Sequence, residues 1–185
     1  MPSLGLLGEK LIQELAVFLR PYSENDFGLL EKLLGDPKMT MHLGGPESAK
    51  KLRERHVKFT AMSKDPSAGC VFVITVGDER TPAGTVGFWE RESKGEKVWE
   101  TGYSVLPEFQ GQGIATRATR LIVKRVSSLR KYRYLYAFPS VDNPASNAIC
   151  RKSGFALLGV ESFEYPAGSF MRCNIWRVDL SETIT

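Results

Sequence analysis

The chain contains few residues of the kinds that build metal sites or disulfide scaffolds. Its three cysteines, Cys70, Cys150 and Cys173, are widely separated in a chain of 185 residues. They are too few for a disulfide framework, and no two share a metal-ligand spacing. The two histidines, His42 and His56, also lie apart without a metal-binding pattern. We therefore expect no metal site, and a reducing, cytoplasmic setting.

Long apolar runs are missing as well. No stretch approaches the roughly 18 apolar residues that a membrane span requires. The first 18 residues are interrupted by Glu9, Lys10 and Glu14 and have no small-residue cleavage site, so we expect neither a signal peptide nor a membrane partner. A hydrophobic fraction of 42% allows a sizeable core, so the fold needs no metal or disulfide to stabilise it. The length predicts a single domain over residues 1–185, with residues 1–14 as an N-terminal extension.

The net charge of +4 suits either nucleic acid or a polyanionic cofactor. Arg117, Arg120 and Lys124 recur at helical spacing, which is typical of a solvated helix face and would also attract phosphates. An RNA-associated protein would show strongly salt-dependent binding. The chain has no basic motif interleaved with aromatic residues, so we do not expect a nucleic-acid partner.

Apolar periodicity predicts a mixed α+β domain. One strand and two helices come first, a meander of three strands follows, and the remaining elements are a helix, a strand, a helix and two strands. Runs of β-branched and aromatic residues, separated by polar turns, define the meander. Strands are predicted at 15–19, 70–76, 83–90, 97–106, 134–138, 155–163 and 170–180, and helices at 24–34, 47–62, 113–129 and 144–152.

The most informative segment joins the end of a predicted strand to an amphipathic helix. Pro107 prevents the strand from continuing, and Gly111 and Gly113 precede the helix. Unpaired N–H groups and the helix dipole favour an anion at such a helix start, and glycines let the backbone approach it closely. The segment predicts a phosphate-binding loop, although a tight turn could use the same residues. It matches neither the Walker loop nor the dinucleotide fingerprint.

A second segment, residues 143–155, has the pattern of a capped helix. Asn143 suits the N-cap, Pro144 the first helical position, and Gly154 the position beyond the helix end. Capping alone accounts for these three residues, but not for the pairing of this segment with the glycine-rich loop.

Together the two segments resemble the GNAT superfamily of N-acetyltransferases. Residues 110–115 fit its Q/R-x-x-G-x-G/A pyrophosphate loop, and residues 143–155 fit its second cofactor motif. Residues 19–26 and 36–46 resemble the branch that contains the ribosomal-protein N-terminal acetyltransferases. The resemblance covers about residues 18–180. It implies an α+β fold with a central, mixed but mostly antiparallel sheet of about seven strands and four flanking helices.

The resemblance also implies that the cofactor is acetyl-CoA. A strand end splayed from its neighbour would bind the pantetheine arm, and the glycine-rich loop would hold the pyrophosphate. Asn143, at the start of the later helix, would reach the pantetheine or the thioester region. The residues that it assigns to cofactor binding are Val105, Leu106, Gln110, Gly111, Gln112, Gly113, Ile114, Ala115, Thr116, Asn143 and Ser146.

The catalytic residues are less well defined. In many members of the superfamily a tyrosine acts as the general acid. Cys150 stands at its position here, so this chain lacks that tyrosine. The resemblance implies Ser146 as the acid and Glu164 as the base, and Glu100 is a second candidate base. Ser146 could equally be a helix-surface hydroxyl, and each glutamate a surface or acceptor-binding charge.

The expected reaction is transfer of an acetyl group to a primary amine by direct attack in a ternary complex. The acceptor would be a protein N-terminal α-amine or a small-molecule amine. The alternative is a non-catalytic acyl-CoA-binding or regulatory domain. A homodimer is common in the branch that the chain resembles.

Overall fold

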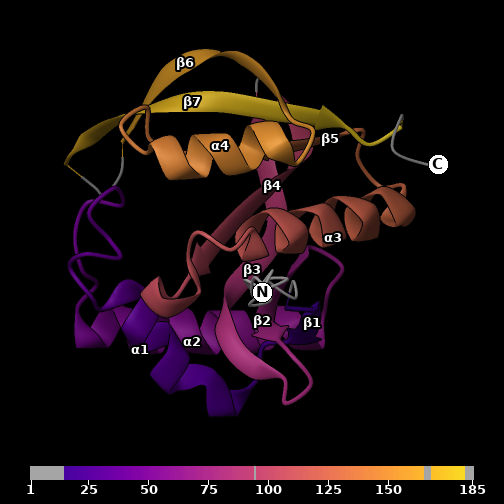
Figure 1. Ribbon diagram of the computed structural model, residues 1–185. Coiled ribbons are helices and arrows are strands. Elements are labelled where there is room, and N and C mark those ends of the chain that lie inside the picture. The colour runs from indigo at the N-terminus through magenta and orange to yellow at the C-terminus, as the bar shows by residue number, and fades with distance from the viewer. Residues whose placement is uncertain (1–14, 94, 165–167, 182–185) are drawn as a thin grey trace, which may run out of the picture.

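The computed structural model describes residues 15–93, 95–164 and 168–181, which form a seven-stranded sheet flanked by helices (Figure 1). The predicted extension, residues 1–14, lies outside this description. The strands are β1 (Val17–Pro21), β2 (Gly69–Val76), β3 (Thr81–Ser93), β4 (Glu96–Val105), β5 (Tyr134–Ala137), β6 (Ala156–Glu164) and β7 (Phe170–Asp179), and the helices are α1 (Phe27–Leu34), α2 (Ala49–Lys64), α3 (Ile114–Leu129) and α4 (Pro144–Lys152).

The sheet confirms the predicted mixed, mostly antiparallel architecture. Its strand order is β1-β2-β3-β4-β5-β7-β6. The pairs from β1 to β4 are antiparallel, as are β5 with β7 and β7 with β6, whereas β4 and β5 run parallel. A parallel pair needs a crossover, and α3 provides it. The sheet therefore consists of two antiparallel halves joined along one parallel pair.

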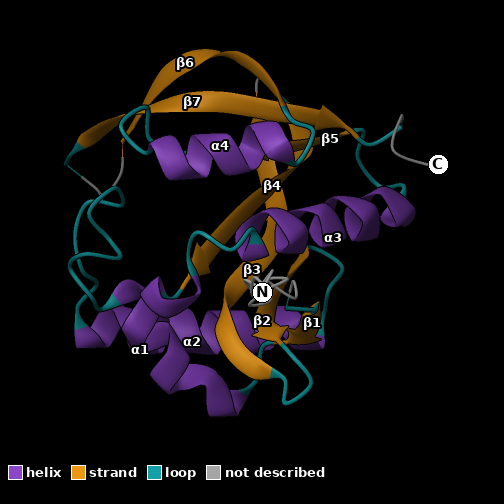
Figure 2. Ribbon diagram, in the orientation of Figure 1, coloured by secondary structure: helices purple, strands orange, loops and turns teal. Residues whose placement is uncertain are grey.

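Helices cover both faces of the sheet (Figure 2). The apolar side of α3 packs with β2, β3 and β4 in a large core, which contains Ile122 and the fully buried Trp99. On the opposite face, a smaller core joins Leu30 of α1 and Leu52 of α2 to Val73 of β2. Within the described ranges, no helix combines the length and the apolar composition that crossing a membrane requires.

One departure from the sequence-based boundaries lies near the start of the chain. The predicted first helix divides into a 3₁₀ turn, Glu24–Asp26, and α1. The carboxylate of Asp26 accepts hydrogen bonds from the Ser23 amide and hydroxyl at 2.8 and 2.7 Å. Both Arg20 guanidinium nitrogens also donate to it. These bonds fix the tight turn before the α-helix begins.

Candidate active site

The sheet splits between β4 and β5. Their parallel pairing is confined to two positions, Trp99 opposite Leu135 and Glu100 opposite Tyr136. β4 continues for five more residues, 101–105, which we call the open edge of β4, while β5 ends at Ala137 and leads toward α4. In Figure 1, β4 runs between the part of the molecule that carries α1 and α2 and the part that carries β5, β6 and β7.

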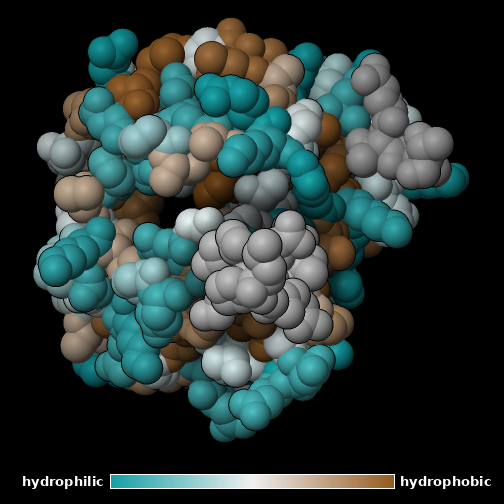
Figure 3. All heavy atoms as spheres, in the orientation of Figure 1, coloured by the Kyte–Doolittle hydropathy of each residue, from teal (hydrophilic) through white to brown (hydrophobic). Residues whose placement is uncertain are grey.

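The backbone of the open edge faces the split. The Leu106 amide donates to the Ala83 carbonyl of β3 at 2.8 Å. Because backbone polar groups alternate along a strand, those of Thr101, Tyr103 and Val105 point the other way, toward the side that β5 leaves. Figure 3 shows a hollow bordered by hydrophobic residues between the two halves of the molecule, beside the loop that follows β4. The open edge can therefore pair with an extended ligand.

The glycine-rich loop follows the open edge directly. Gly111 and Gly113 have φ angles of +74° and +72°, and a Cβ at either position would meet no heavy atom within 4 Å. The positive φ angles explain why glycine stands there, and the open space leaves room for a ligand beside the backbone. Gln110 braces the loop, because its side-chain amide donates to the Val105 carbonyl at 2.8 Å. Ile114, at the start of α3, is 1% exposed and anchors the loop in the core.

The first turn of α3 presents backbone amides rather than a capping side chain. None of the described side chains caps this helix at its N-cap, Gly113. Ala115 is half-buried and Thr116 is buried. The backbone N–H groups of the first turn have no partner within the helix, so they are the groups that a ligand could contact there. Arg117, from the predicted basic stripe, bends back to donate to the Gln112 carbonyl at 3.1 Å. The loop thus combines free amides with a nearby positive charge.

The start of α4 confirms the predicted cap. The Asn143 side-chain oxygen accepts a hydrogen bond from the Ser146 amide at 3.0 Å, and Pro144 occupies the first helical position. Ser146 is half-buried in this first turn. Its carbonyl accepts a hydrogen bond from the Tyr103 hydroxyl of β4 at 2.9 Å. The bond places the first turn of α4 beside the open edge.

Sequence reasoning missed Asn147, which fixes α4 to the second half of the sheet. Its side-chain nitrogen donates to the carbonyls of Ser140 and Asn143 at 2.9 and 2.8 Å. Its side-chain oxygen accepts from Asn174 at 2.7 Å and from the Trp176 indole at 2.8 Å. The four partners come from the loop before α4 and from β7, and only the fold brings them together, so no local pattern predicts this role.

Glu100 lies on the face of the sheet opposite α3 and α4. Its neighbour Trp99 is in the core under α3, so alternation turns Glu100 to the other side. The carboxylate accepts a hydrogen bond from Arg91 at 2.8 Å, and its side chain is 19% exposed. Glu100 is also the last residue of β4 that pairs with β5. It therefore stands where the split begins, on the face away from Ser146.

Aromatic rings surround this ion pair. The Arg91 guanidinium lies 4.2 Å from the ring centroid of Phe138 and 5.0 Å from that of Phe163. On the same face, the Trp89 indole lies so close to Gly102 that a Cβ there would approach it to 2.8 Å. These contacts were not predicted, because they join residues from three separate strands and a loop. They give this face an apolar floor beside the Glu100 carboxylate.

Glu164, the other candidate base, lies at the end of β6. Its side chain is exposed, and its carboxylate accepts a hydrogen bond from the Gly168 amide at 2.8 Å. Glu164 is thus on the hairpin between β6 and β7, while Ser146 is in α4. The described contacts connect Glu164 with its own hairpin, and its role as a base stays a prediction.

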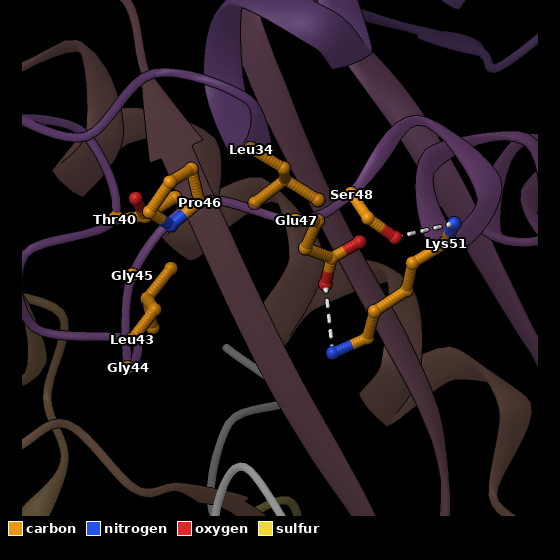
Figure 4. Close-up of a pocket in the computed structure, with 9 residues that line it drawn as sticks. All are labelled: Leu34, Thr40, Leu43, Gly44, Gly45, Pro46, Glu47, Ser48 and Lys51. Atoms are coloured by element: carbon orange, nitrogen blue, oxygen red, sulfur yellow. Dashed lines mark hydrogen bonds and ion pairs between the residues drawn. The ribbon is translucent and has the colours of Figure 1, made fainter.

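The loop between α1 and α2 borders the glycine-rich loop. Met39 accepts a hydrogen bond on its sulfur from the Gln110 side chain at 3.6 Å. The same loop lines a pocket of about 130 Å³ (Figure 4). Glu47 lies in that pocket, and its carboxylate forms ion pairs with Arg55 and Lys51. Glu47 is thus held by Arg55 and Lys51 within this pocket.

A sheet split beside a glycine-rich helix start offers strand backbone groups to an extended ligand and helix amides to an anion. Comparison of the sequence with known families agrees with this class of site. Residues 16–156, more than half of the chain, match the acetyltransferase (GNAT) domain. The chain belongs to this family, and it is an acetyl-CoA-dependent N-acetyltransferase.

Solved structures with the same fold include acetyltransferases of several kinds. A GNAT-family acetyltransferase from Bacillus anthracis has a TM-score of 0.73 and 15% identity, over 90% of this chain and 96% of that one. Spermidine N-acetyltransferase from Vibrio cholerae, in complex with CoA and spermine, has a TM-score of 0.72 and 19% identity, over 89% and 96%. An acetyltransferase from Salmonella typhimurium modifies the N-terminal serine of ribosomal protein L7/L12. Its structure has a TM-score of 0.71 and 22% identity, over 88% of this chain and 94% of that one. At these identities, the likeness concerns the fold.

Proposed function

We propose that this enzyme transfers the acetyl group to a primary amine, by direct attack within a ternary complex, at the split between β4 and β5. The observation that carries the proposal is the open edge of β4. Pairing with β5 stops at Glu100, and from there to the glycine-rich loop β4 is paired with β3 on one side and with none of the described strands on the other. This arrangement supports an extended ligand that adds to the strand and ends at the amides of α3.

The residues present fit acetyl-CoA, with one refinement of the sequence-based assignment. Both backbone groups of Leu106 are engaged within the protein, with Ala83 and Phe109. We therefore assign the pantetheine contacts to the backbone groups of Thr101 and Tyr103 and to the Val105 amide, since the Val105 carbonyl accepts from Gln110. The amides from Gly111 to Thr116 would hold the pyrophosphate, because Gly111 and Gly113 leave open space where other residues carry a Cβ. Asn143 and Ser146 would lie beside the thioester end.

Acetyl-CoA supplies an acetyl thioester, which an unprotonated amine can attack. Amides of the open edge are oriented to stabilise the negative charge that develops on the carbonyl oxygen. Glu100 stands at the start of the split on the opposite face from Ser146, so it can take the proton of an incoming amine. Glu164 is the alternative base, and it would act from the β6–β7 hairpin.

The aromatic face around Glu100 supports an amine acceptor. Trp89, Phe138 and Phe163 form an apolar floor there, and Arg91 holds the carboxylate in place. Relatives in fold act on a protein N-terminus and on a polyamine, as their names state. For this chain we propose the same two acceptor classes, a protein N-terminal α-amine or a small-molecule amine.

The two classes place different demands on the base. An α-amine with a pKa of about 7.8 is roughly one-third unprotonated at pH 7.5, whereas an alkyl amine with a pKa of about 10.4 is only about 0.1% unprotonated. A carboxylate at Glu100 therefore matters most for an alkyl amine. Glu100→Gln should lower kcat/KM for a diamine by about 10²-fold, and much less for a short peptide.

The test is a panel of peptides and alkyl amines assayed at fixed pH, with acetyl-CoA as the donor. Glu54→Gln is the matched control, because Glu54 is an exposed residue of α2. Transfer to at least one amine, with the loss confined to Glu100→Gln, is the expected result. Binding of acetyl-CoA without transfer to any amine would favour the non-catalytic acyl-CoA-binding domain instead.

A further inference from the structure

A tyrosine from β4 fills the place where the superfamily's tyrosine is missing. Tyr103 belongs to the open edge, and its side chain crosses to α4. There its hydroxyl lies 3.3 Å from the Cys150 sulfur and donates to the Ser146 carbonyl at 2.9 Å. Cys150 is the residue that stands at the usual tyrosine position. A phenol is thus present at this point of the site, but it comes from the strand instead of the helix.

The position of this phenol relates directly to the split. The backbone of Tyr103 faces the space that β5 leaves, while its side chain lies on the α4 face of the sheet. Glu100, three residues earlier, lies on the opposite face. A thioester seated along the open edge would therefore have the candidate base on one face and the Tyr103 hydroxyl on the other.

The surroundings of Tyr103 keep its hydroxyl protonated. Burial raises the pKa of this phenol well above 10, and the neighbouring Cys150 raises it further. Burial also raises the pKa of the Cys150 thiol, to about 11. Both groups are therefore neutral at neutral pH, so the Tyr103 hydroxyl carries its proton before the reaction.

We propose that the Tyr103 hydroxyl is the acid that protonates the departing CoA sulfur, a role that rests on the proposed function. The amine nitrogen forms a bond to the acetyl carbon, and the carbon–sulfur bond breaks with its electron pair left on sulfur. Tyr103 gives its proton to that sulfur, and the amine loses one proton to the base. The phenolate then regains a proton from solvent, so the products are an amide and a thiol.

The test compares Tyr103→Phe with a matched variant, Tyr132→Phe. Tyr132 also donates its hydroxyl proton to a protein group, Glu90, but it lies outside the proposed site. We expect Tyr103→Phe to lower kcat by about 10²-fold with little change in the KM for acetyl-CoA, and Tyr132→Phe to leave kcat unchanged.

A binding measurement separates this role from a structural one. The wild type should bind CoA about fivefold to tenfold more tightly than desulfo-CoA, which lacks the sulfur, and Tyr103→Phe should abolish that preference. The proposal would be overturned if Tyr103→Phe lowered the affinities for CoA and desulfo-CoA equally, or if the preference for CoA survived in this variant. Absence of transfer by the wild type to every amine would count against the proposed function, while the comparison of the two ligands would still test the contact.

Discussion

The side chain of Asn147 should be worth several kcal/mol to the stability of the fold. It is 8% exposed, and it joins α4, the loop before it and β7 through four hydrogen bonds. We consider Asn147→Leu, which conserves the approximate volume and removes all four bonds. The substitution leaves the indole nitrogen of Trp176, itself 4% exposed, without its partner.

A net value of about 0.5–1.5 kcal/mol for each hydrogen bond gives a loss of about 2–6 kcal/mol. The upper half of that range is expected, since a buried indole N–H without a partner carries an additional desolvation cost. Urea unfolding, followed by tryptophan fluorescence and circular dichroism, measures the free energy of unfolding. Asn25→Leu is the control, because Asn25 is exposed in the 3₁₀ turn. A loss below about 1 kcal/mol for Asn147→Leu would refute the reasoning.

Two further predictions concern titratable groups. Burial raises the pKa of Asp26, but hydrogen bonds from Arg20 and Ser23 outweigh it, so the net pKa lies below its usual value. A group with a depressed pKa contributes stability that is present above about pH 4 and is lost as the pH falls. Asp26→Asn should therefore reduce the loss of unfolding free energy between neutral and acidic pH. An unchanged loss would contradict this. Burial raises the pKa of Cys150 to about 11, so only about 0.1% of its thiol is ionised at pH 8. Mass spectrometry after brief iodoacetamide treatment should therefore find Cys150 unmodified until urea unfolds the protein, and rapid native labelling would contradict its burial.

The sequence predicted the architecture because its signals were local. Alternation and turn residues located the meander, and the capping residues Asn143 and Gly154 located α4. The boundaries shifted where long-range contacts decided them. β1, predicted at 15–19, lies at Val17–Pro21, since Pro21 pairs with Phe72 of β2. β3 extends to Ser93, beyond its predicted end, because it pairs along the whole of β4.

The cofactor side of the site was also visible in the sequence, since its loop consists of consecutive residues. The split between β4 and β5, expected from the resemblance, is confirmed by the two-position pairing. On the acceptor side, Glu100 was a candidate, but the residues that surround it were not predicted. Arg91 meets Glu100 from the neighbouring strand, and Phe138 and Phe163 reach the guanidinium from other elements, so no local spacing records the cluster.

The Tyr103 hydroxyl was missed for a related reason. Alternation along β4 places Tyr103 on the face of Trp99, but a strand tyrosine gives no sign that its hydroxyl reaches α4. The motif that contains Cys150 indicates a position on α4 and contains no information about β4. The functional group lies on another element, which only the packing of β4 against α4 reveals.

The most direct test of the account is a calorimetric titration with acetyl-CoA of the wild type and of Gly113→Glu. The control is Gly95→Glu, because Gly95 also has a positive φ and open space at the Cβ position but lies in the turn between β3 and β4. Both variants carry the same charge and the same backbone strain. Binding by the wild type and by Gly95→Glu, with affinity at least about tenfold weaker in Gly113→Glu, is the predicted result. Equal affinity in all three proteins would contradict the placement of the pyrophosphate on this loop, and with it the site at the split between β4 and β5.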